Sequence, residues 1–357
     1  MTIPSTPEAR LYRAGAALGS EWGVEVDIGT GHEIKTIKSA NLPGARNQGY
    51  LMLKESGNTF LTRGIAGAVD NCDIAPEAYM RYEAGPLGVI LACLFGASPT
   101  PATIGSGAFL HTMTWEPSSL GKFVSYAEEY PGKIYSVPSA KPVKVVFSLQ
   151  DGVLKITPTL RGNIVINDSA VNPELDDLTC LDEENEVLLS DCTAIWMREF
   201  DEEAALDADD QKGASGFEIT FGRGLESAKP LAGQSYLAEA QEEDFSDIRV
   251  KLDFPFEDEF NREFFEHYII GQYYSLIMKF QGIIIGSTYT YELNLYFPKL
   301  RLSAMPDMSK EGLIRVSAEF QATDAAYGLE AEPAGFDEYL PYLELQNTQE
   351  TAYIPAA

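Results

Sequence analysis

Alternating apolar and polar positions predict two matching strands far apart in the chain. In residues 152–160 apolar side chains recur at every second position, and residues 312–320 repeat this phase 160 positions later. The apolar sets are Leu154, Ile156, Pro158 and Leu160, and Ile314, Val316, Ala318 and Phe320. Such alternation is typical of half-buried strands. The long period indicates duplication of a whole domain, because solenoid repeats span about 20–50 residues.

The same patterns predict further strands and two helical regions. Strands are expected over 24–28, 34–37, 60–69, 110–115, 123–127, 143–149, 153–161, 186–200, 248–254, 289–302 and 312–322. One helical region covers 77–95 with an interruption at Gly85-Pro86, and an amphipathic helix covers 258–270. The apolar parity of the long strand over 289–302 shifts at Pro298-Lys299, which predicts a β-bulge.

These elements predict a mainly β protein with two tandem copies of a β-sandwich or barrel, each with one short helix. The expected parts are an N-terminal arm, a first copy, an acidic insert or linker, a second copy and a C-terminal arm. Their boundaries are 1–19, 20–170, 171–214, 215–325 and 326–357. A chain of 357 residues is long enough for two such cores.

The charge of the chain is strongly negative and unevenly spread. The formal net charge is −28, from 26 basic and 54 acidic residues. Residues 1–170 carry 14 basic and 15 acidic residues, whereas residues 171–357 carry 12 and 39. This balance argues against duplex DNA or an anionic membrane as a tightly bound partner, since both are polyanions. The 15 acids of 174–210 are expected on a solvent-facing surface, because unpaired buried carboxylates are costly.

Cysteine usage and the N-terminus predict a reducing compartment. The chain has four cysteines without CxxC spacing, at positions 72, 93, 180 and 192. The first residues lack the cationic and apolar layout of a signal peptide. The longest apolar run, 86–97, is too short to span a bilayer. We therefore expect a soluble protein made in a cytoplasm, with no membrane partner.

One acidic segment partly matches a calcium-binding loop. Residues 207–213, with Glu218 as a distant twelfth ligand, place acids at EF-hand ligand positions. The loop glycine is expected at position six, where Lys212 stands, and Gly213 follows one position later. A solvated acidic loop is therefore the favoured interpretation, and no metal site is predicted.

The remaining candidate chemistry is weak. His32, His111 and His267 lie far apart and are expected at strand or helix surfaces. Gly29-Thr30-Gly31 lacks the third glycine of a dinucleotide-binding loop, because Ile34 stands there, so a turn is predicted. No GxSxG elbow or Walker loop occurs. We predict no catalytic or cofactor-binding residues, no cofactor, and a protein that is not an enzyme.

Aromatic residues cluster near the second helix. The cluster comprises Phe264, Phe265, Tyr268, Tyr273 and Tyr274. We interpret it as core or subunit interface in preference to a ligand platform. The three tryptophans, Trp22, Trp115 and Trp196, are likewise expected to serve packing.

The order strand, helix, long strand, glycine turn and final strand resembles the tail tube, or major tail, proteins of long-tailed bacteriophages. The resemblance rests on three sequence segments and covers about 20–165 and 215–325. The segments are Gly85–Gly96, with the sequence GPLGVILACLFG, then His111–Trp115, with HTMTW, and Glu311–Phe320, with EGLIRVSAEF. In this family a helix ending in glycine leads through a loop into such a strand.

The resemblance implies a structural virion protein of the siphophage type. The simplest members form hexameric rings, each subunit giving strands to a shared inner β-barrel. Two copies in one chain imply three chains per ring with pseudo-sixfold symmetry, with six chains as the alternative. The strands expected in that barrel are 143–149, 153–161, 291–302 and 313–322.

The implied setting is a virion tail assembled in the host cytoplasm. The partners would be further copies of the chain, the tape-measure protein, and the tail terminator and distal tail proteins. DNA would pass through the lumen only during ejection. The acidic insert is expected on the outside of the tube and the lumen is expected to be net negative.

Other functions stay open at this stage. A soluble two-domain β-sandwich binding module, of glycan or adhesin type, and the tube protein of a contractile injection system are the alternatives. A hydrolase with dispersed carboxylates would need an acid pair that the sequence does not locate.

Overall fold

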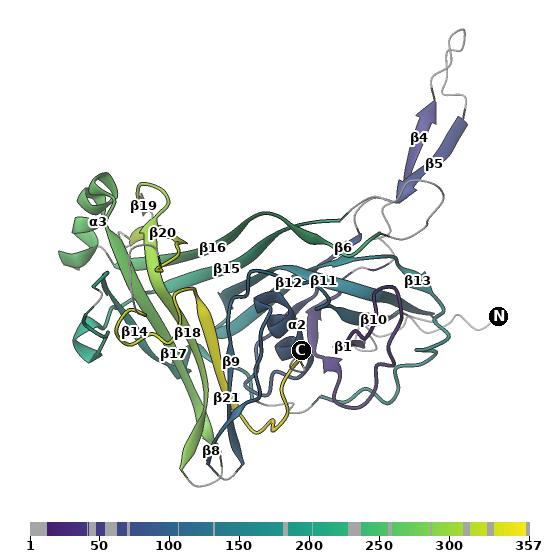
Figure 1. Ribbon diagram of the computed structural model, residues 1–357, viewed down its shortest axis with the longest axis horizontal. Helices are drawn as coiled ribbons and strands as arrows, with labels where there is room; N and C mark the ends of the chain where they lie inside the picture. Colours follow the sequence, from purple (N-terminus) through teal and green to yellow (C-terminus); the bar gives the residue numbers. More distant parts are fainter. Residues whose placement is uncertain are drawn as a thin grey trace.

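The protein is mainly β, with 53% of residues in strands, 9% in helices and one large antiparallel sheet. The computed structural model describes the residues 13–40, 42, 48–53, 63–69, 72–105, 107–130, 133–180, 185–201, 203–227, 237–255, 259–285, 288–309, 315–326 and 332–354. Figure 1 shows the strands and the two helices in sequence colours.

The strands of the first part of the chain are β1 (Ala14–Leu18), β2 (Glu33–Ile34), β3 (Thr36–Lys38), β4 (Gln48–Leu53), β5 (Arg63–Val69), β6 (Cys72–Ile74), β7 (Glu77–Tyr79), β8 (Ala102–Gly105), β9 (Ala108–Met113), β10 (Val124–Tyr130), β11 (Lys133–Gln150), β12 (Val153–Gly162) and β13 (Ile166–Asn167). The later strands are β14 (Cys192–Glu199), β15 (Gly216–Glu226), β16 (Gln241–Pro255), β17 (Tyr273–Ile285), β18 (Tyr289–Leu302), β19 (Asp307–Ser309), β20 (Arg315–Ala322) and β21 (Tyr342–Asn347). The helices are α2 (Pro86–Phe95) and α3 (Glu259–Ile270), with short 3-10 helices η2 (Leu189–Asp191) and η3 (Ala208–Asp210).

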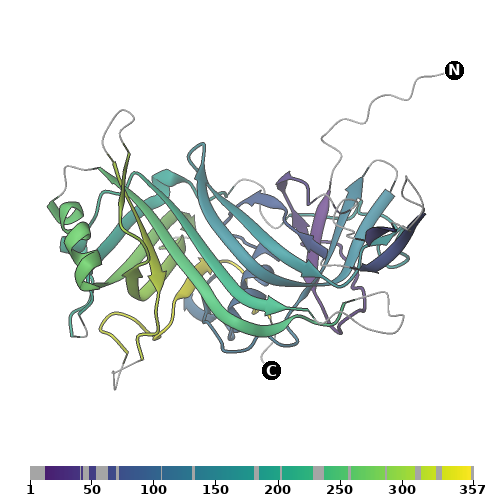
Figure 2. The ribbon, with the colours of Figure 1, turned by 90° about the horizontal axis from the view of Figure 1, so that it is seen from above.

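The long strands run side by side in the order β12, β11, β15, β16 and β20, each antiparallel to the next. The pair β11–β15 joins the two sequence ranges 20–170 and 215–325, with Lys144 opposite Gly222. Figure 2 shows these strands bending across the molecule. The two ranges therefore contribute to one sheet and share a hydrophobic cluster.

The two matching segments of the sequence form β12 and β20, which occupy equal positions on either side of β15. Their apolar residues alternate as predicted. The buried side chains are Leu154, Ile156, Pro158 and Leu160 in β12, and Val316, Ala318 and Phe320 in β20. Ile314 lies outside the described residues. The alternation is confirmed, and the two strands run in the same direction within the sheet.

Helix α2 lies in the core, where it contacts β11, β10 and β1. Nine of its ten residues are buried. Pro86 stands at its first turn, and Gly96 ends it with a φ of 92°, a left-handed conformation that glycine adopts without a steric penalty. The helix predicted over 77–83 is wrong: β7 occupies 77–79, because its backbone pairs with β12 and β3.

Helix α3 matches its prediction, and Phe264 of its aromatic stripe packs inward. The Phe264 ring lies 5.5 Å from that of Phe254, 5.6 Å from Tyr274 and 5.7 Å from Phe320. Phe264 and Tyr274 are fully buried, which confirms the core interpretation for these two residues.

The predicted bulge at Pro298-Lys299 is confirmed. Tyr274 pairs with Leu300 and Leu276 with Phe297, so β18 carries one residue more than β17 across this step. The extra residue moves the buried set from Leu293, Leu295 and Phe297 to Leu300 and Leu302, and all five are in the core. Residues 24–28, predicted as a strand, are irregular.

The segments near both ends of the chain take part in the main sheet. Strand β1, within 1–19, pairs with β10 and β2. Strand β21, within 326–357, pairs with β18 and with β9, and its residues Leu343 and Leu345 are fully buried. A polar, proline-containing sequence therefore includes a central strand.

One hairpin stands apart from the main sheet. Strands β4 and β5 form a separate two-stranded sheet, with Leu51 opposite Ile65. Figure 1 shows this hairpin projecting well away from the rest of the chain. Among the described residues its strands pair only with each other.

Candidate functional site

The five long strands present a continuous polar face opposite their buried face. Buried positions alternate with more exposed ones over 143–148 of β11, 153–162 of β12, 216–221 of β15, 247–255 of β16 and 316–321 of β20, as expected for a sheet that covers a core on one side. The polar residues along them include Lys144, Ser148, Lys155, Thr157, Thr159, Arg161, Glu218, Thr220, Asp247, Arg249, Lys251, Asp253, Ser317, Glu319 and Gln321. Both signs of charge occur on this face.

Three of the five basic residues named on this face are bound to carboxylates, namely Lys155, Arg161 and Arg249. Arg249 contacts Asp247 at 2.7 Å on its own strand and Glu319 at 3.2 Å on β20. Arg161 pairs with Asp73 at 2.9 Å, and the Arg161 pKa is raised by this hydrogen bond. The residues named on this face comprise five basic and four acidic side chains, so ion pairing, and not an excess of acid, limits the contacts that the face offers to a polyanion.

A neighbouring carboxylate and two lysines extend this pattern to β7, which pairs with β12 and β3. Glu77 binds Lys38 at 2.6 Å and Lys155 at 3.1 Å. These two lysines hold the pKa of the Glu77 carboxyl below its usual value. The carboxylate therefore remains charged at mildly acidic pH and keeps both lysines engaged.

The acids of the segment 174–210 lie at the surface, as predicted. Every acid of this segment that the structure describes is exposed or half-exposed, and none is buried. Several of the described acids nevertheless make specific contacts within the fold. Glu186 binds Arg81 at 2.8 Å, and Asp191 accepts a hydrogen bond from Tyr82 at 3.1 Å.

The calcium-like segment folds as a capped 3-10 turn. The Asp207 carboxylate accepts a hydrogen bond from the Asp209 backbone at 2.8 Å, and Asp210 accepts one from the Asp207 backbone at 3.1 Å. Asp210 also pairs with Arg198 at 3.4 Å. Glu218, the distant twelfth position, lies on the polar face of β15, where it lines a depression with Lys144 and Arg249. Residues 207–210 thus form an acidic surface turn, as the sequence predicted.

The residues Gly29 to His32 form a turn, as predicted. The His32 amide donates to the Gly29 carbonyl at 3.1 Å, and Gly31 has a φ of 80°. Thr30, Gly31 and His32 line a cavity of about 590 Å³, which also borders the start of α2 and residues 348–353. Burial lowers the pKa of His32.

His111 corrects the expectation of a surface histidine. Its side chain is fully buried, its Nε2 lies 2.8 Å from the Gln349 carbonyl, and its ring packs on Tyr353 with centroids 4.7 Å apart. Desolvation lowers the pKa of this imidazole. The reason is β21, which pairs with β9 and brings the segment after it over the His111 ring.

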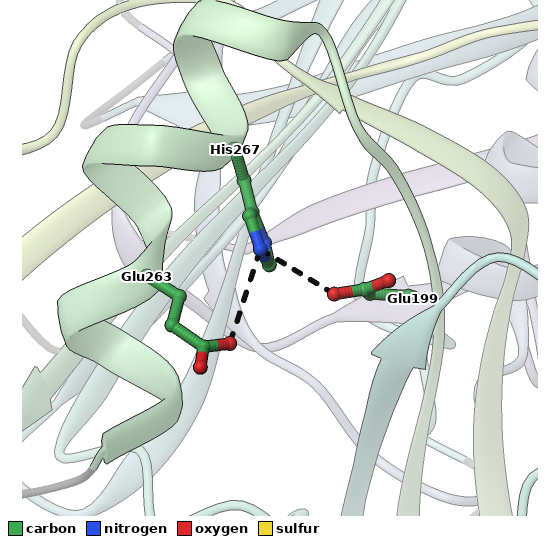
Figure 3. A group of neighbouring side chains, drawn as sticks. All are labelled: Glu199, Glu263 and His267. Carbon is green, nitrogen blue, oxygen red and sulfur yellow. Dashed lines mark ion pairs between the residues drawn. The ribbon is translucent and has the colours of Figure 1, made fainter.

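His267 is the histidine that lies among potential ligands. Its Nε2 is 3.4 Å from Glu199 Oε1 and 3.9 Å from Glu263 Oε2. Figure 3 shows the imidazole pointing between the two carboxylates, one from its own helix and one from the end of β14. Within the described part of the chain, this is the only group of three such side chains close enough to share a metal ion.

Sequence reasoning missed this cluster for a specific reason. Glu263 and His267 are four positions apart on α3, so one face of the helix carries both. The sequence alone therefore indicates that these two side chains are neighbours. Glu199 comes from a strand 64 residues earlier. It reaches the helix because β14 pairs with β17, with Glu199 opposite Tyr274.

The tryptophans serve packing, as predicted. Trp115 packs on Phe95 with ring centroids 5.4 Å apart, and Trp22 packs on Phe123 at 5.1 Å. Trp196 lies under the Lys279 ammonium at 4.2 Å. All four cysteines are free thiols, and burial raises the pKa of Cys72 and of Cys93 to about 12.

Comparison with known proteins gives no relative from which a function can be carried over. No model of a known protein family matches the chain, and no curated protein matches its sequence. In the part of the chain that the structure describes, no helix is both long and apolar enough to cross a bilayer.

Proposed function

We propose that the protein is a structural subunit that assembles with further copies of itself into stacked rings, as in the tail tube of a long-tailed bacteriophage. The observation that carries this proposal is the projecting hairpin β4–β5. A two-stranded hairpin alone is at best marginally stable in water, and open strand edges seek partners. Its sequence is rich in apolar residues, such as the run Tyr50–Leu53. A neighbouring subunit would supply the missing partner.

Exposed apolar side chains on the main body support assembly as well. Phe245 on β16 is 93% exposed, and Ile269 at the end of α3 is 75% exposed. Ile283 and Ile284 are exposed near the far end of β17. Contiguous exposed apolar patches are typical of contact surfaces between proteins, and Ile283 and Ile284 are adjacent on β17.

The sheet gives the proposal its ring geometry. In the proposed ring, the polar face of β12, β11, β15, β16 and β20 lines the channel, and neighbouring subunits continue the sheet beyond β6 and β7, which pair with β12, and beyond β19, which pairs with β20. The matching strands β12 and β20 would then be the two equivalent contributions of one chain, and three chains would complete a pseudo-sixfold ring. Closure through strand pairing removes the open edges of each sheet.

The same face supports a conduit for DNA. Phosphate contacts by Lys and Arg supply nearly all non-specific affinity for DNA. On this face Arg249 and Arg161 are already bound to carboxylates. In the proposed tube, the pairing of these two arginines, together with the acidic surface of the chain, lets DNA pass without being held. The tape-measure, tail terminator and distal tail proteins are the further partners of such a tube.

The role of the hairpin in assembly can be tested by substitutions that leave the rest of the protein unchanged. The variant Leu51→Glu with Ile65→Lys replaces a cross-strand apolar pair by an opposite-charge pair, which still favours the hairpin. A matched control, Val171→Glu with Leu120→Lys, makes the same charge changes at two exposed positions of the body. Both variants should melt at the wild-type temperature.

Mass photometry and sedimentation velocity then measure the state of assembly. The proposal predicts oligomers for the wild type and the control, and monomers for the hairpin variant. A wild-type chain that stays monomeric at high concentration would contradict the proposal and would favour a monomeric binding module. Equal assembly of all three proteins would exclude the hairpin as the contact.

A further inference from the structure

We propose that Glu199, Glu263 and His267 form a zinc-binding site that ties helix α3 to the end of strand β14. The inference is independent of the proposed assembly. It rests on the geometry of the three side chains and on the groups that orient them.

The ligand atoms already lie near the spacing of a zinc polyhedron. With zinc–ligand distances of about 2.0–2.1 Å, the ligand atoms of a tetrahedral site are about 3.3 Å apart. His267 Nε2 lies 3.4 Å from Glu199 Oε1 and 3.9 Å from Glu263 Oε2, and all three ligand atoms fall within 4.8 Å of one another. Small rotations of the two glutamate side chains are enough to close the site.

The imidazole is held by a residue behind it. His267 Nδ1 lies 2.6 Å from the Tyr274 hydroxyl. When Nδ1–H donates to the Tyr274 oxygen, the Nε2 lone pair points at the carboxylates. Metal-binding histidines commonly use their second nitrogen in this way.

The first glutamate is held as well. The Gln272 side-chain amide donates to Glu199 Oε2 at 3.2 Å, which leaves Oε1 facing His267. Gln272 sits in the turn between α3 and β17, and its backbone amide donates to the His267 carbonyl at 3.0 Å. The turn thus fixes the helix end and one carboxylate together.

The donor set selects the metal. One imidazole and two carboxylates suit zinc, whereas magnesium and calcium prefer oxygen ligands alone. The Glu199 side chain is 47% exposed and that of Glu263 is 50% exposed, so the fourth position faces solvent and a water molecule can fill it. The site therefore acts as a clamp between two elements that are distant in sequence.

The test is a titration of the full-length protein with zinc chloride, followed by calorimetry and by thermal melting. The key variant is Glu263→Gln, and its matched control is Glu266→Gln. Glu266 lies on the same helix, is exposed and belongs to no ligand group. Both changes remove one negative charge, so a difference between them reports ligation and not net charge.

The wild type and Glu266→Gln should bind one zinc ion per chain and melt a few degrees higher with zinc. Glu263→Gln should bind at least about tenfold more weakly. Tyr274→Phe keeps the buried ring but removes the hydroxyl, and it should weaken zinc about 10–100-fold through the orientation of His267. Cobalt(II) should give the absorption of a tetrahedral site in the wild type and in Glu266→Gln, and not in Glu263→Gln.

Two results would overturn the inference. One is a wild-type chain that binds no zinc at millimolar concentration, which would leave the cluster as an ion pair only. The other is equal zinc affinity of Glu263→Gln and Glu266→Gln, which would place the zinc elsewhere. Circular dichroism of each variant verifies that the chain is folded before it is titrated.

Discussion

The guanidinium of Arg223 donates a hydrogen bond to the Phe95 carbonyl at 2.7 Å, from strand β15 to the last turn of helix α2. It also binds the carbonyls of Leu94 and of Glu116. The Trp115 ring lies 4.4 Å from its central carbon. Burial lowers the Arg223 pKa to about 10, so the group is still charged at neutral pH. The Arg223 side chain, from the second half of the chain, thus donates hydrogen bonds to carbonyls at the end of a helix in the first half.

The first prediction concerns this cation. Arg223→Met should lower the free energy of unfolding by about 3–5 kcal/mol, because buried carbonyls lose their donor and Glu242 loses its ion pair with Arg223. Arg249→Met removes an arginine whose ion pairs are half-exposed, and it should cost under about 1 kcal/mol. Urea unfolding measures both. Similar losses for the two variants would show that Arg223 contributes no more than a surface arginine.

The second prediction concerns the contact between α2 and the end of the chain. A Cβ added at Gly88 would lie 2.2 Å from the Tyr353 ring. Gly88→Ala should therefore destabilise the protein by about 1–3 kcal/mol, although alanine favours helices. In a Tyr353→Leu background the same change should cost much less. Gly213→Ala, where a Cβ meets nothing within 4 Å, is the control and should be nearly neutral.

The third prediction is a pH dependence that comes from His111. Its folded pKa lies below the ordinary value of 6.5, so folding favours the neutral ring. The stability that depends on neutral His111 is present above pH 6.5 and is lost as the pH falls toward the folded pKa. His111→Gln should flatten this acid loss.

The measurement is the difference in unfolding free energy between wild type and His111→Gln at pH 7.5, 6.5 and 5.5. That difference should shift in favour of the variant as the pH falls. His32, whose pKa is also lowered, remains in both proteins and cancels in the comparison. A difference that does not change with pH would show that His111 has the same pKa in the folded and unfolded chains.

The fourth prediction concerns DNA. The wild-type protein should show no binding to duplex DNA tighter than about 100 μM at physiological salt. Asp247→Asn with Glu319→Gln frees Arg249 from both of its carboxylates and should raise the affinity measurably, with a salt dependence. Fluorescence anisotropy with a labelled duplex measures both proteins. Tight wild-type binding would argue against a channel that lets DNA pass.

The sequence predicted those features that depend on neighbouring residues. The bounds of β18 and the bulge at Pro298-Lys299 follow from a local parity shift, and the end of α2 follows from Gly96. The burial of Phe264 follows from the stripe of α3. In each case the information lies within a few residues of the feature.

Other features depend on pairing between distant segments, and a single sequence does not contain that information. Residues 77–83 have helix-forming composition, but the backbone of β7 pairs with β12, and Lys155 binds Glu77 there. The polar composition of the C-terminal range gives no signal for β21, whose position depends on pairing with β18 and β9. The proximity of Glu199 to His267 likewise depends on the pairing of β14 with β17.

The central claim is that copies of this chain close into rings with an open channel, and electron microscopy of the purified full-length protein tests it most directly. The account predicts rings or stacked tubes in which three chains give six similar sheet segments around the channel. Six chains in each ring would change the stoichiometry and keep the function. A protein that remains a dispersed monomer at every concentration, with no ring or tube in any image, would contradict the claim.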